Sequence, residues 1–468
     1  MRVLLVRPPA LHSVEHEVPE AIKAEATAYP PLGLLHLATW IRAAGRHEVA
    51  VLDAQAEGLD PAGVAARVRE FAPDVVGVSA FTVYLLDVVA TTEAVRACPS
   101  VRHVVLGGPH VNDFPREARG LPGVDAAVRG EGQVPLLALL DAWAEGGDGR
   151  GIPGVLVDPG GPEPALVTTT EDLDELPIPD RTLVDFRRYY DVLGSGAPFS
   201  TVVTSRGCPF RCTFCNTPRH RFRSMSAGRI CDEIQACLDL GITDVYFVDD
   251  TFNITNRRVH EMCDEVLARG LRFAWTVRMR VNGVDRPLLE KMKAAGCTRI
   301  QFGVEQGTEE GLQRLQKGVT LEEVRTAFRL ARKVGIHTVA YFLVGTPTER
   351  TRRDVLSTIL FSIRLDPDFA LYNILTPFPG TRLYDEGVEE GVIRDDAWRA
   401  FLASPHDGFR AQPWDQHFTA AQLERLHRWA YRLFYGRPKF AARNLLQIRT
   451  AADLERKARA GLRLLLER

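Results

Sequence analysis

Long hydrophobic runs, a disulfide framework and an excess of positive charge are all missing from this sequence. The apolar run at the N-terminus stops at Pro8, too early for a signal-peptide core or a membrane-spanning helix. Eight cysteines in 468 residues do not resemble the paired cysteines of a secreted domain. The formal net charge of -2 gives no basic field for nucleic acid. We therefore expect a cytoplasmic protein with reduced thiols, no transmembrane segment and no nucleic-acid partner.

The length of the chain and its 45% hydrophobic residues predict two or three globular units rather than one core. In residues 1–145, short apolar runs alternate with stretches of helical periodicity. The runs cover residues 3–6, 48–52, 75–79, 104–106 and 126–128, and the helical stretches cover 32–44, 61–71 and 86–97. This alternation predicts an α/β fold with a doubly wound, Rossmann-like sheet. A Gly- and Pro-rich linker is expected over residues 146–195, with a small β element at 154–157.

The alternation resumes in residues 196–380 and predicts a partial (βα)6 barrel. Its apolar runs cover residues 199–204, 244–248, 272–277, 299–303, 338–344 and 369–375. In such barrels the active site lies at the C-terminal ends of the strands. Residues 381–468 are expected to form a mainly helical region, with Arg-rich helices at 420–433 and 450–466.

Three closely spaced cysteines follow the first predicted strand of the barrel. Cys208, Cys212 and Cys215 lie in the sequence SRGCPFRCTFCN. Three thiolate ligands on a four-iron cluster leave one iron without a protein ligand, where a cofactor or substrate can bind. Zinc is the competing metal, with His220 as a fourth ligand. A third alternative is that the thiols are buried and bind nothing.

This cysteine loop resembles the signature of the radical S-adenosylmethionine (SAM) superfamily, with Phe214 as the aromatic residue before the last cysteine. The resemblance implies a 4Fe-4S cluster held by Cys208, Cys212 and Cys215 as catalytic metal ligands. It also implies that SAM binds at the open iron and that one electron, from a flavodoxin or ferredoxin type of donor, breaks its carbon–sulfur bond. The resulting radical abstracts hydrogen from the substrate.

Five residues at the predicted strand ends resemble the SAM contacts of that superfamily. Asp249 and Asp250 match the position that holds the SAM amine, although both could instead cap a helix. Arg278 could pair with the SAM carboxylate, or be a surface arginine. Glu305 in FGVEQGT resembles the ribose contact, and a buried carboxylate needs a partner in either case. Gly345 in GTPTE resembles the loop that lies against adenine.

Glycine-containing turns follow two late strands of the N-terminal sheet, where open α/β sheets bind ligands. A flavodoxin-like domain without a ligand would show the same turns, and the absence of G-x-G-x-x-G argues against a dinucleotide. Together with YPPLGLLHLA and VSAFT upstream, the GGPH and RGEGQ turns resemble the cobalamin-binding radical SAM proteins. The cobalamin contacts that this implies are Ser79, Thr82, Gly107, Gly108, His110, Gly130 and Glu131.

Cobalamin is expected to bind here without a histidine as the lower cobalt ligand. The sequence contains no D-x-H-x-x-G motif, and His110 is a poor candidate for that role. His12, after the first strand, could contact the corrin ring, although we interpret it as a solvated loop histidine.

The resemblance implies a cobalamin-dependent radical SAM methyltransferase. Such an enzyme uses two SAM molecules to methylate an unactivated carbon of a small-molecule or natural-product substrate. The alternative is a cyclase or ring-rearranging enzyme that acts on a porphyrin or isoprenoid without net methyl transfer. A methylthiotransferase is disfavoured, because its N-terminal domain would need three cysteines and only Cys98 lies there.

The C-terminal aromatic residues allow two interpretations, a packed helical cap or a substrate-binding surface. The residues concerned are Trp398, Trp414, Trp429, Tyr431, Phe434 and Tyr435.

Overall fold

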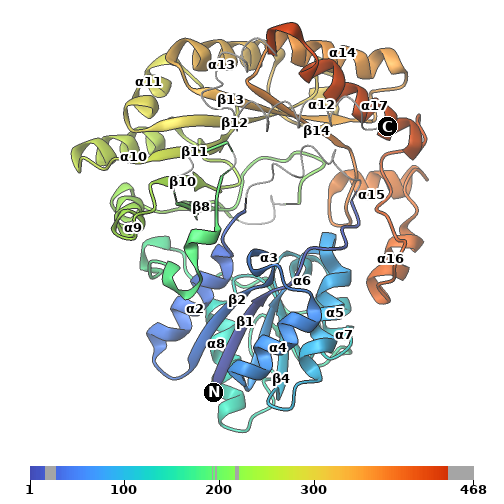
Figure 1. The fold of residues 1–468 in the computed structure, drawn as a ribbon. Coiled ribbons are helices and arrows are strands. Elements are labelled where there is room, and N and C mark those ends of the chain that lie inside the picture. The colour runs from blue at the N-terminus through green and yellow to red at the C-terminus, as the bar shows by residue number, and fades with distance from the viewer. Residues whose placement is uncertain (16–27, 192, 195–197, 217–220, 441–468) are drawn as a thin grey trace, which may run out of the picture. The chain divides into compact units, whose positions relative to one another are not determined.

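The structure, a computed structural model, describes residues 1–15, 28–191, 193–194, 198–216 and 221–440. These residues form two compact units (Figure 1). The first contains Met1–Glu15, Ala28–Tyr189 and Asp395–Arg410, and the second contains the described residues of Tyr190–Arg394 and of 411–440. The predicted helix at 450–466 and the alternative zinc ligand His220 lie outside the described residues. Within the described part of the chain, no helix is both long and apolar enough to cross a membrane.

The first unit is built on a six-stranded sheet, as the alternation of apolar runs predicted. Its strands are β1 (Arg2–Arg7), β2 (Glu48–Asp53), β3 (Val75–Ser79), β4 (His103–Gly107), β5 (Ala126–Val128) and β6 (Val155–Leu156). The strand order is β2-β1-β3-β4-β5-β6, with β1 to β5 parallel and β6 antiparallel to β5. The direction of winding therefore reverses between β1 and β3, which is the topological switch point of the sheet.

Helices cover both faces of this sheet, which confirms the doubly wound fold (Figure 1). They are α2 (Leu32–Ala44), α3 (Ala54–Glu57), α4 (Pro61–Phe71), α5 (Leu85–Arg96), α6 (Pro109–Asp113), α7 (Pro115–Gly120) and α8 (Gln133–Ala144), with a 3-10 turn η1 (Thr82–Tyr84). Alternate strand residues such as Val3 and Leu5 pack against Leu34 of α2 and Leu139 of α8. Since side chains alternate across a strand, the other set faces the opposite layer.

The segment predicted as a linker packs largely with this sheet. Its residues 146–189 fall within the first unit, and 3-10 turns lie at Leu173–Glu175, Arg181–Leu183 and Phe186–Arg188. Asp180 accepts a bond from Arg42 of α2 at 2.7 Å, and its backbone N–H donates to the Thr39 hydroxyl at 2.8 Å. Helix α16 (Asp395–Ala403), which we had placed in a C-terminal domain, also belongs to this unit and packs on α7.

The second unit is a six-stranded, all-parallel sheet with its helices outside, which confirms the predicted partial barrel (Figure 1). Its strands are β7 (Phe199–Val202), β10 (Asp244–Phe247), β11 (Ala274–Met279), β12 (Cys297–Glu305), β13 (His337–Val344) and β14 (Phe369–Ile374). Their spatial order is β7-β10-β11-β12-β13-β14. A small hairpin of β8 (Ser205–Arg206) and β9 (Arg223–Ser224) flanks the cysteine loop.

Amphipathic helices follow the barrel strands in turn. They are α9 (Ala227–Asp239), α10 (Asn256–Ala268), α11 (Arg286–Ala294), α12 (Glu309–Arg314), α13 (Leu321–Val334), α14 (Arg352–Leu365), α15 (Arg382–Glu389) and α17 (Ala420–Tyr435). The boundaries follow local capping chemistry. Thr320 and Glu323 form a capping box at the start of α13, which ends at Gly335 with a φ of 78°.

Most of the C-terminal aromatic residues are buried in the core, which agrees with the interpretation of a packed helical cap. Trp414, Tyr431 and Phe434 are at most 1% exposed, and the Tyr431 hydroxyl donates to the Tyr372 carbonyl of β14 at 3.1 Å. Trp429, at 45% exposure, is the exception.

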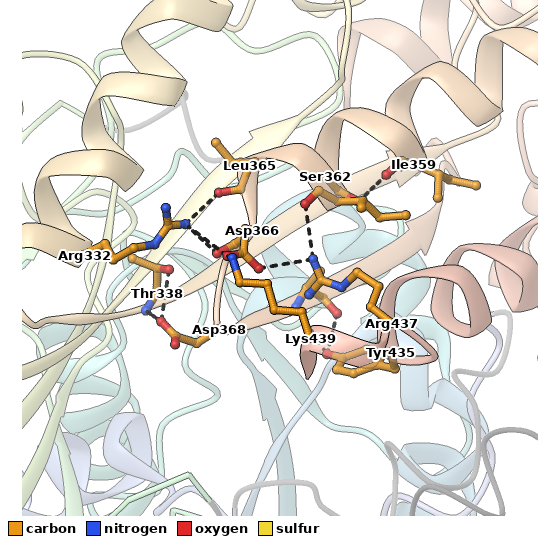
Figure 2. Close-up of polar contacts among 12 residues, drawn as sticks. Arg332, Thr338, Ile359, Ser362, Leu365, Asp366, Asp368, Tyr435, Arg437 and Lys439 are labelled. Atoms are coloured by element: carbon orange, nitrogen blue, oxygen red, sulfur yellow. Dashed lines mark hydrogen bonds and ion pairs between the residues drawn. The ribbon is translucent and has the colours of Figure 1, made fainter. Parts of the chain in front are cut away.

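A buried carboxylate fastens the chain after α17 to the barrel (Figure 2). Asp366, which ends α14 with a φ of 54°, is surrounded by three cations. Its partners are Lys439 at 2.6 Å, Arg437 at 3.4 Å and Arg332 at 3.7 Å. The two cations in the sequence Tyr435-Gly-Arg-Pro-Lys therefore help to hold the chain after α17 on the barrel.

Candidate functional site

The cysteine loop leaves the C-terminal end of β7, where the barrel was expected to carry its chemistry. Cys208, Cys212 and Cys215 are half-buried and are not joined in disulfides, and the Cys215 N–H donates to the Cys212 carbonyl at 3.2 Å. The loop is tied to its surroundings at Thr213, whose N–H donates to Leu315 at 3.0 Å. Among the described residues, no three side chains of His, Cys, Asp or Glu form a ready-made metal site. The donor set nevertheless fits an iron–sulfur cluster, because all three thiols project from one short loop.

Asp249, at the end of β10, lies beneath the start of this loop. Its carboxylate accepts the backbone N–H groups of Thr204 at 2.6 Å and Ser205 at 3.2 Å. It also accepts both side-chain hydroxyls and pairs with Arg258 of α10 at 3.3 Å. Asp249 is 1% exposed and both oxygens are used by the chain itself. The prediction that Asp249 contacts SAM therefore has no support from its surroundings, and Asp249 instead positions the loop.

Asp250 and Thr251, which follow Asp249 in the chain, also contact the cysteine loop. The Gly207 N–H donates to the Asp250 carboxylate, and the Thr251 hydroxyl lies 3.7 Å from the Cys208 thiol. Surrounding protein atoms and then the Asp249 charge raise the pKa of Asp250, although its side chain still reaches solvent. The alternative that these aspartates cap a helix is wrong, since Thr255 caps α10. Residues 249–251 therefore support successive positions of the cysteine loop.

Arg280 is a site residue that the sequence analysis missed. Its guanidinium donates to the Cys212 sulfur at 3.6 Å and lies 3.8 Å from the centre of the Phe210 ring. It also donates to the Lys317 carbonyl, and it is 5% exposed. The signal was present in the sequence, but we ended the third strand at residue 277. Because β11 continues to Met279, Arg280 occupies the position that directly follows the strand.

Arg278, the arginine that we had chosen, lies within β11 rather than after it. Its side chain is exposed and bonds the Tyr246 hydroxyl, and its charge acts on Asp250. The Tyr246 and Tyr341 hydroxyls both donate to Gln301, at 2.9 and 2.7 Å. Arg278 therefore belongs to a polar row that crosses neighbouring strands of the sheet.

Glu305 ends β12 in a strained conformation, with a φ of 70° and a register shift beside it. Its partner is Lys317, whose ammonium donates to the carboxylate at 2.7 Å and lies 6.0 Å from the Phe214 ring centre. A Cβ on Gly303 would lie 2.6 Å from the Glu305 oxygen. The Glu305–Lys317 pair therefore packs directly on the backbone of Gly303. The buried carboxylate thus has the partner that we expected, and the pair connects β12 with the cysteine loop.

The turn after β13 is organised by a buried carboxyl group. Glu349 accepts the N–H groups of Gly345 at 2.7 Å and Thr346 at 3.0 Å, and the Thr358 hydroxyl at 3.1 Å. Burial raises the pKa of Glu349. Gly345 has a φ of 80°, and a Cβ there would lie 2.6 Å from Leu423 of α17. The glycine is therefore required both by the turn and by the packing of α17.

In the first unit, the GGPH turn brings two strand ends together. The φ of Gly108 is 104°, and a Cβ there would lie 2.9 Å from the Ala80 carbonyl. His110 is 0% exposed, and its Nδ1 lies 3.1 Å from the Thr82 hydroxyl. Burial lowers the pKa of His110 to about 4, which keeps the ring neutral. The buried His110 ring therefore contacts the Thr82 hydroxyl from the interior of the unit, and it offers no exposed nitrogen to a ligand.

The RGEGQ turn is engaged by the segment that we had predicted to be a linker. Gly130 forms an isolated parallel β-bridge with Val167, and a Cβ at Gly130 would lie 2.4 Å from the Val167 carbonyl oxygen. The Glu131 carboxylate accepts the Thr169 N–H at 2.8 Å. These residues hold the chain against the sheet edge.

Ser79, Thr82 and Gly107, which lie at or just after the C-terminal ends of β3 and β4, stay partly exposed. A Cβ at Gly107 would meet nothing closer than 3.9 Å, which leaves an unfilled surface beside the end of β4. Such a bare surface at the C-terminal strand ends fits a flat cofactor.

Both halves of the chain match known domains. Residues 202–359 match the Radical SAM superfamily, and residues 23–140 match the B12 binding domain. An uncharacterized methyltransferase of Pyrococcus horikoshii is 33% identical over 459 residues, covering 96% of this chain and 95% of that protein. The anaerobic magnesium-protoporphyrin IX monomethyl ester cyclase of Rubrivivax gelatinosus is 28% identical, over 82% of this chain and 70% of its own length.

A solved structure has the same fold. The radical S-adenosylmethionine methyltransferase TsrM from Kitasatospora setae, with cobalamin and a [4Fe-4S] cluster bound, matches with a TM-score of 0.69 at 23% identity. The match covers 84% of this chain and 76% of that one. With both domains present in this order and a relative that spans nearly the whole chain, the protein belongs to the cobalamin-dependent radical SAM family.

Proposed function

We propose that this protein is a methyltransferase that adds a methyl group to an unactivated carbon of a small-molecule substrate, using two SAM molecules. The observation that carries the proposal is the cysteine loop, which buried side chains support in a chain that also contains a B12 binding domain. The methyltransferase relative, which is similar over 96% of this chain, supports it further.

When bound, the cluster supplies the electron that cleaves SAM, and the corrinoid supplies a cobalt that can accept a methyl group. Cys208, Cys212 and Cys215 would hold the cluster. We assign the SAM amine to Asp250 and the SAM carboxylate to Arg278, because their charges are complementary to those groups. The electron would come from an external flavodoxin or ferredoxin type of protein.

The remaining SAM contacts are assigned by position. Glu305 would bind the ribose, with Lys317 holding its carboxylate in place. The turn at Gly345 would lie against adenine, and Phe214 would border the cluster.

At the edge of the first sheet we assign direct cobalamin contacts to Ser79, Thr82 and Gly107, which remain partly exposed. Gly108, His110, Gly130 and Glu131 then act as supporting residues, because their atoms already contact the chain itself.

The second candidate is a ring-forming enzyme without net methyl transfer, which the similarity to the anaerobic cyclase of Rubrivivax gelatinosus favours. Both functions require 5′-deoxyadenosine formation, but only the methyltransferase must release S-adenosylhomocysteine.

The two functions can be separated before the substrate is known. The full chain would be reconstituted anaerobically with iron, sulfide and hydroxocobalamin, reduced with titanium(III) citrate and mixed with SAM. We expect a rapid burst of S-adenosylhomocysteine that is stoichiometric with bound cobalt. Formation of 5′-deoxyadenosine without this burst would favour the cyclase and contradict the methyltransferase.

A further inference from the structure

Helices α14 and α17 carry arginines whose charge is not neutralised by the chain. The two helices pack side by side on the outside of the barrel (Figure 1). Their exposed or half-exposed arginines that have no hydrogen bond or ion pair to any described residue are Arg352, Arg353, Arg364, Arg425 and Arg428. The acidic residues of these helices are Asp354 and Glu424. Asp354 accepts the Arg350 and Thr351 N–H groups at 3.0 and 2.7 Å, and Glu424 already interacts with the chain.

Two other barrel helices neutralise their exposed arginines locally. Arg257 pairs with Glu261 on α10, and Arg286 pairs with Glu290 on α11, both at 2.7 Å. Pairs four positions apart on a helix stabilise it modestly and cancel its surface charge. The charge on α14 and α17 is therefore a local excess in a chain whose formal net charge is -2.

The same two helices expose three large apolar side chains. Trp429 and Leu433 of α17 are 45% and 43% exposed, and Leu360 of α14 is 47% exposed. Because Trp429 and Leu433 are four positions apart, they project from the same side of α17. Apolar side chains that gather among cations on a surface indicate an interaction site more strongly than single exposed leucines do.

Contacts at both ends of α17 align it with α14. Arg437, just after α17, donates to the Ile363 carbonyl near the end of α14 at 3.2 Å, and it also lies beside Asp366 (Figure 2). At the other end, Leu423 packs on Gly345, which precedes α14. The two helices therefore run in the same direction. Since both rise equally per residue, Leu433 lies near the level of Leu360.

We propose that the outer face of α14 and α17 docks on an anionic phospholipid surface. Guanidinium groups are attracted to the phosphates of anionic lipids, and tryptophan prefers the level of the headgroups. Arginine stems can lie along apolar surface while their charged ends reach the headgroups. A nucleic acid or an acidic protein would match the charge but would leave Leu360 and Leu433 against a polar surface. The inference does not depend on which reaction the barrel carries out.

The test is binding of the reconstituted full chain to lipid vesicles. Vesicles of phosphatidylglycerol and phosphatidylcholine in equal amounts are compared with vesicles of phosphatidylcholine alone, and flotation measures the bound fraction. We expect binding to the anionic vesicles only. Binding should weaken as salt is added, because salt screens the attraction between exposed charges.

Variants locate the face. Arg425→Gln and Arg428→Gln should each weaken vesicle binding by about fivefold, which is the contribution of one basic residue near an anionic surface. The matched controls lie on α10. Arg257→Gln removes a cation whose side chain is 86% exposed, and Leu267→Ala truncates an apolar residue that is 46% exposed. Both controls should bind vesicles as the wild type does.

Trp429 reports whether the face reaches the lipid. It is the exposed tryptophan, whereas the other tryptophans are buried or half-buried. Phosphatidylglycerol with brominated acyl chains should quench part of the wild-type tryptophan emission. Trp429→Phe should remove most of that quenching.

Several outcomes would overturn the proposal. They are absence of wild-type binding to the anionic vesicles, equal binding by the two arginine variants, equal losses in the α10 controls, and quenching that persists in Trp429→Phe. Retention on duplex DNA but not on vesicles would assign the face to another partner and overturn it as well. Formation of 5′-deoxyadenosine and S-adenosylhomocysteine is measured without vesicles, so each of these results leaves the proposed function standing.

Discussion

Two regions of the molecule are built differently. One is the end of the barrel that carries the cysteine loop, and the other is the set of C-terminal strand ends in the first sheet, where we propose that cobalamin binds. In the barrel, buried charged side chains hold the loop, with Asp249 under Thr204 and Ser205 and with Arg280 against Cys212. At the C-terminal strand ends of the first sheet, glycine turns bring backbone against backbone, and the charged contacts include the Arg7–Asp53 pair at 3.3 Å. A radical reaction needs a fixed electron path, whereas a large flat cofactor needs open surface. Substitutions that change charge should therefore act most strongly in the barrel, and those that add volume should act at the sheet edge.

The largest effect is expected from Cys212→Ala. Loss of one thiolate removes a cluster ligand, so SAM cleavage to 5′-deoxyadenosine should disappear together with most of the bound iron. Chromatography of the nucleoside and an iron assay measure both. Cys263→Ala is the matched control, because burial raises the pKa of that thiol to about 12 and it is 0% exposed in the core. A Cys212→Ala protein that still cleaved SAM would contradict the cluster assignment.

Asp249→Asn tests whether buried charge holds the cysteine loop. The Arg258 guanidinium would lose its carboxylate, and the new amide would face the Thr204 and Ser205 hydroxyls. Breaking a buried pair from one side costs about 3–5 kcal/mol. Thermal unfolding and iron retention should both fall, and adding Arg258→Met should recover part of the loss. An unchanged melting temperature would show that the network is dispensable.

Two glycines test the sheet edge. Gly130→Ala should lower the free energy of unfolding by about 1–3 kcal/mol, because its φ is 91° and a Cβ would overlap Val167. Gly107→Ala should leave unfolding nearly unchanged, since a Cβ there meets nothing closer than 3.9 Å, but it should weaken cobalamin binding. Equal loss of stability in both variants would remove the distinction between supporting and open turns. Urea unfolding and cobalamin titration measure the two effects.

Arg280→Gln tests a charge at the cluster itself. A hydrogen bond and positive charge on a ligand sulfur favour the reduced cluster, so the variant should have a lower reduction potential by about 60 mV, which is tenfold for one electron. A spectroscopic redox titration without SAM measures the shift. Arg278→Gln is the control, because its side chain bonds Tyr246 instead. Equal shifts in both variants would mean that only general charge matters.

The smallest effect concerns Glu349, whose pKa burial raises. The folded state holds this proton more tightly than the unfolded chain, so its contribution to stability is present at low pH and is lost as the pH rises from the ordinary glutamate range through the folded pKa. Glu349→Gln should remove that dependence, worth about 1 kcal/mol for each pH unit in the window. Unfolding measured across the acid range checks it, and parallel curves for both proteins would argue against a perturbed Glu349.

The sequence predicted the features that depend on local spacing. The strand rhythm gave both sheets, and Cys208, Cys212 and Cys215 are recognisable because one loop carries all three thiols. Arg280 was missed because a strand end was placed two residues early.

Other features depend on contacts that local spacing does not reveal. Val167 fills the space beside Gly130, and Asp87 orients His12 from 75 positions away. Neither pairing leaves a periodic or local signal, so the sheet edge was read as more open than it is.

The most direct test of the two-cofactor account is a metal count on one sample. The full chain, reconstituted anaerobically with iron, sulfide and hydroxocobalamin and then freed of unbound metal, should contain about four iron atoms and about one cobalt per chain. In Cys212→Ala the iron should be lost and the cobalt retained, since the thiol and the B12 binding domain lie in different units. Iron without cobalt in the wild-type protein would contradict the account.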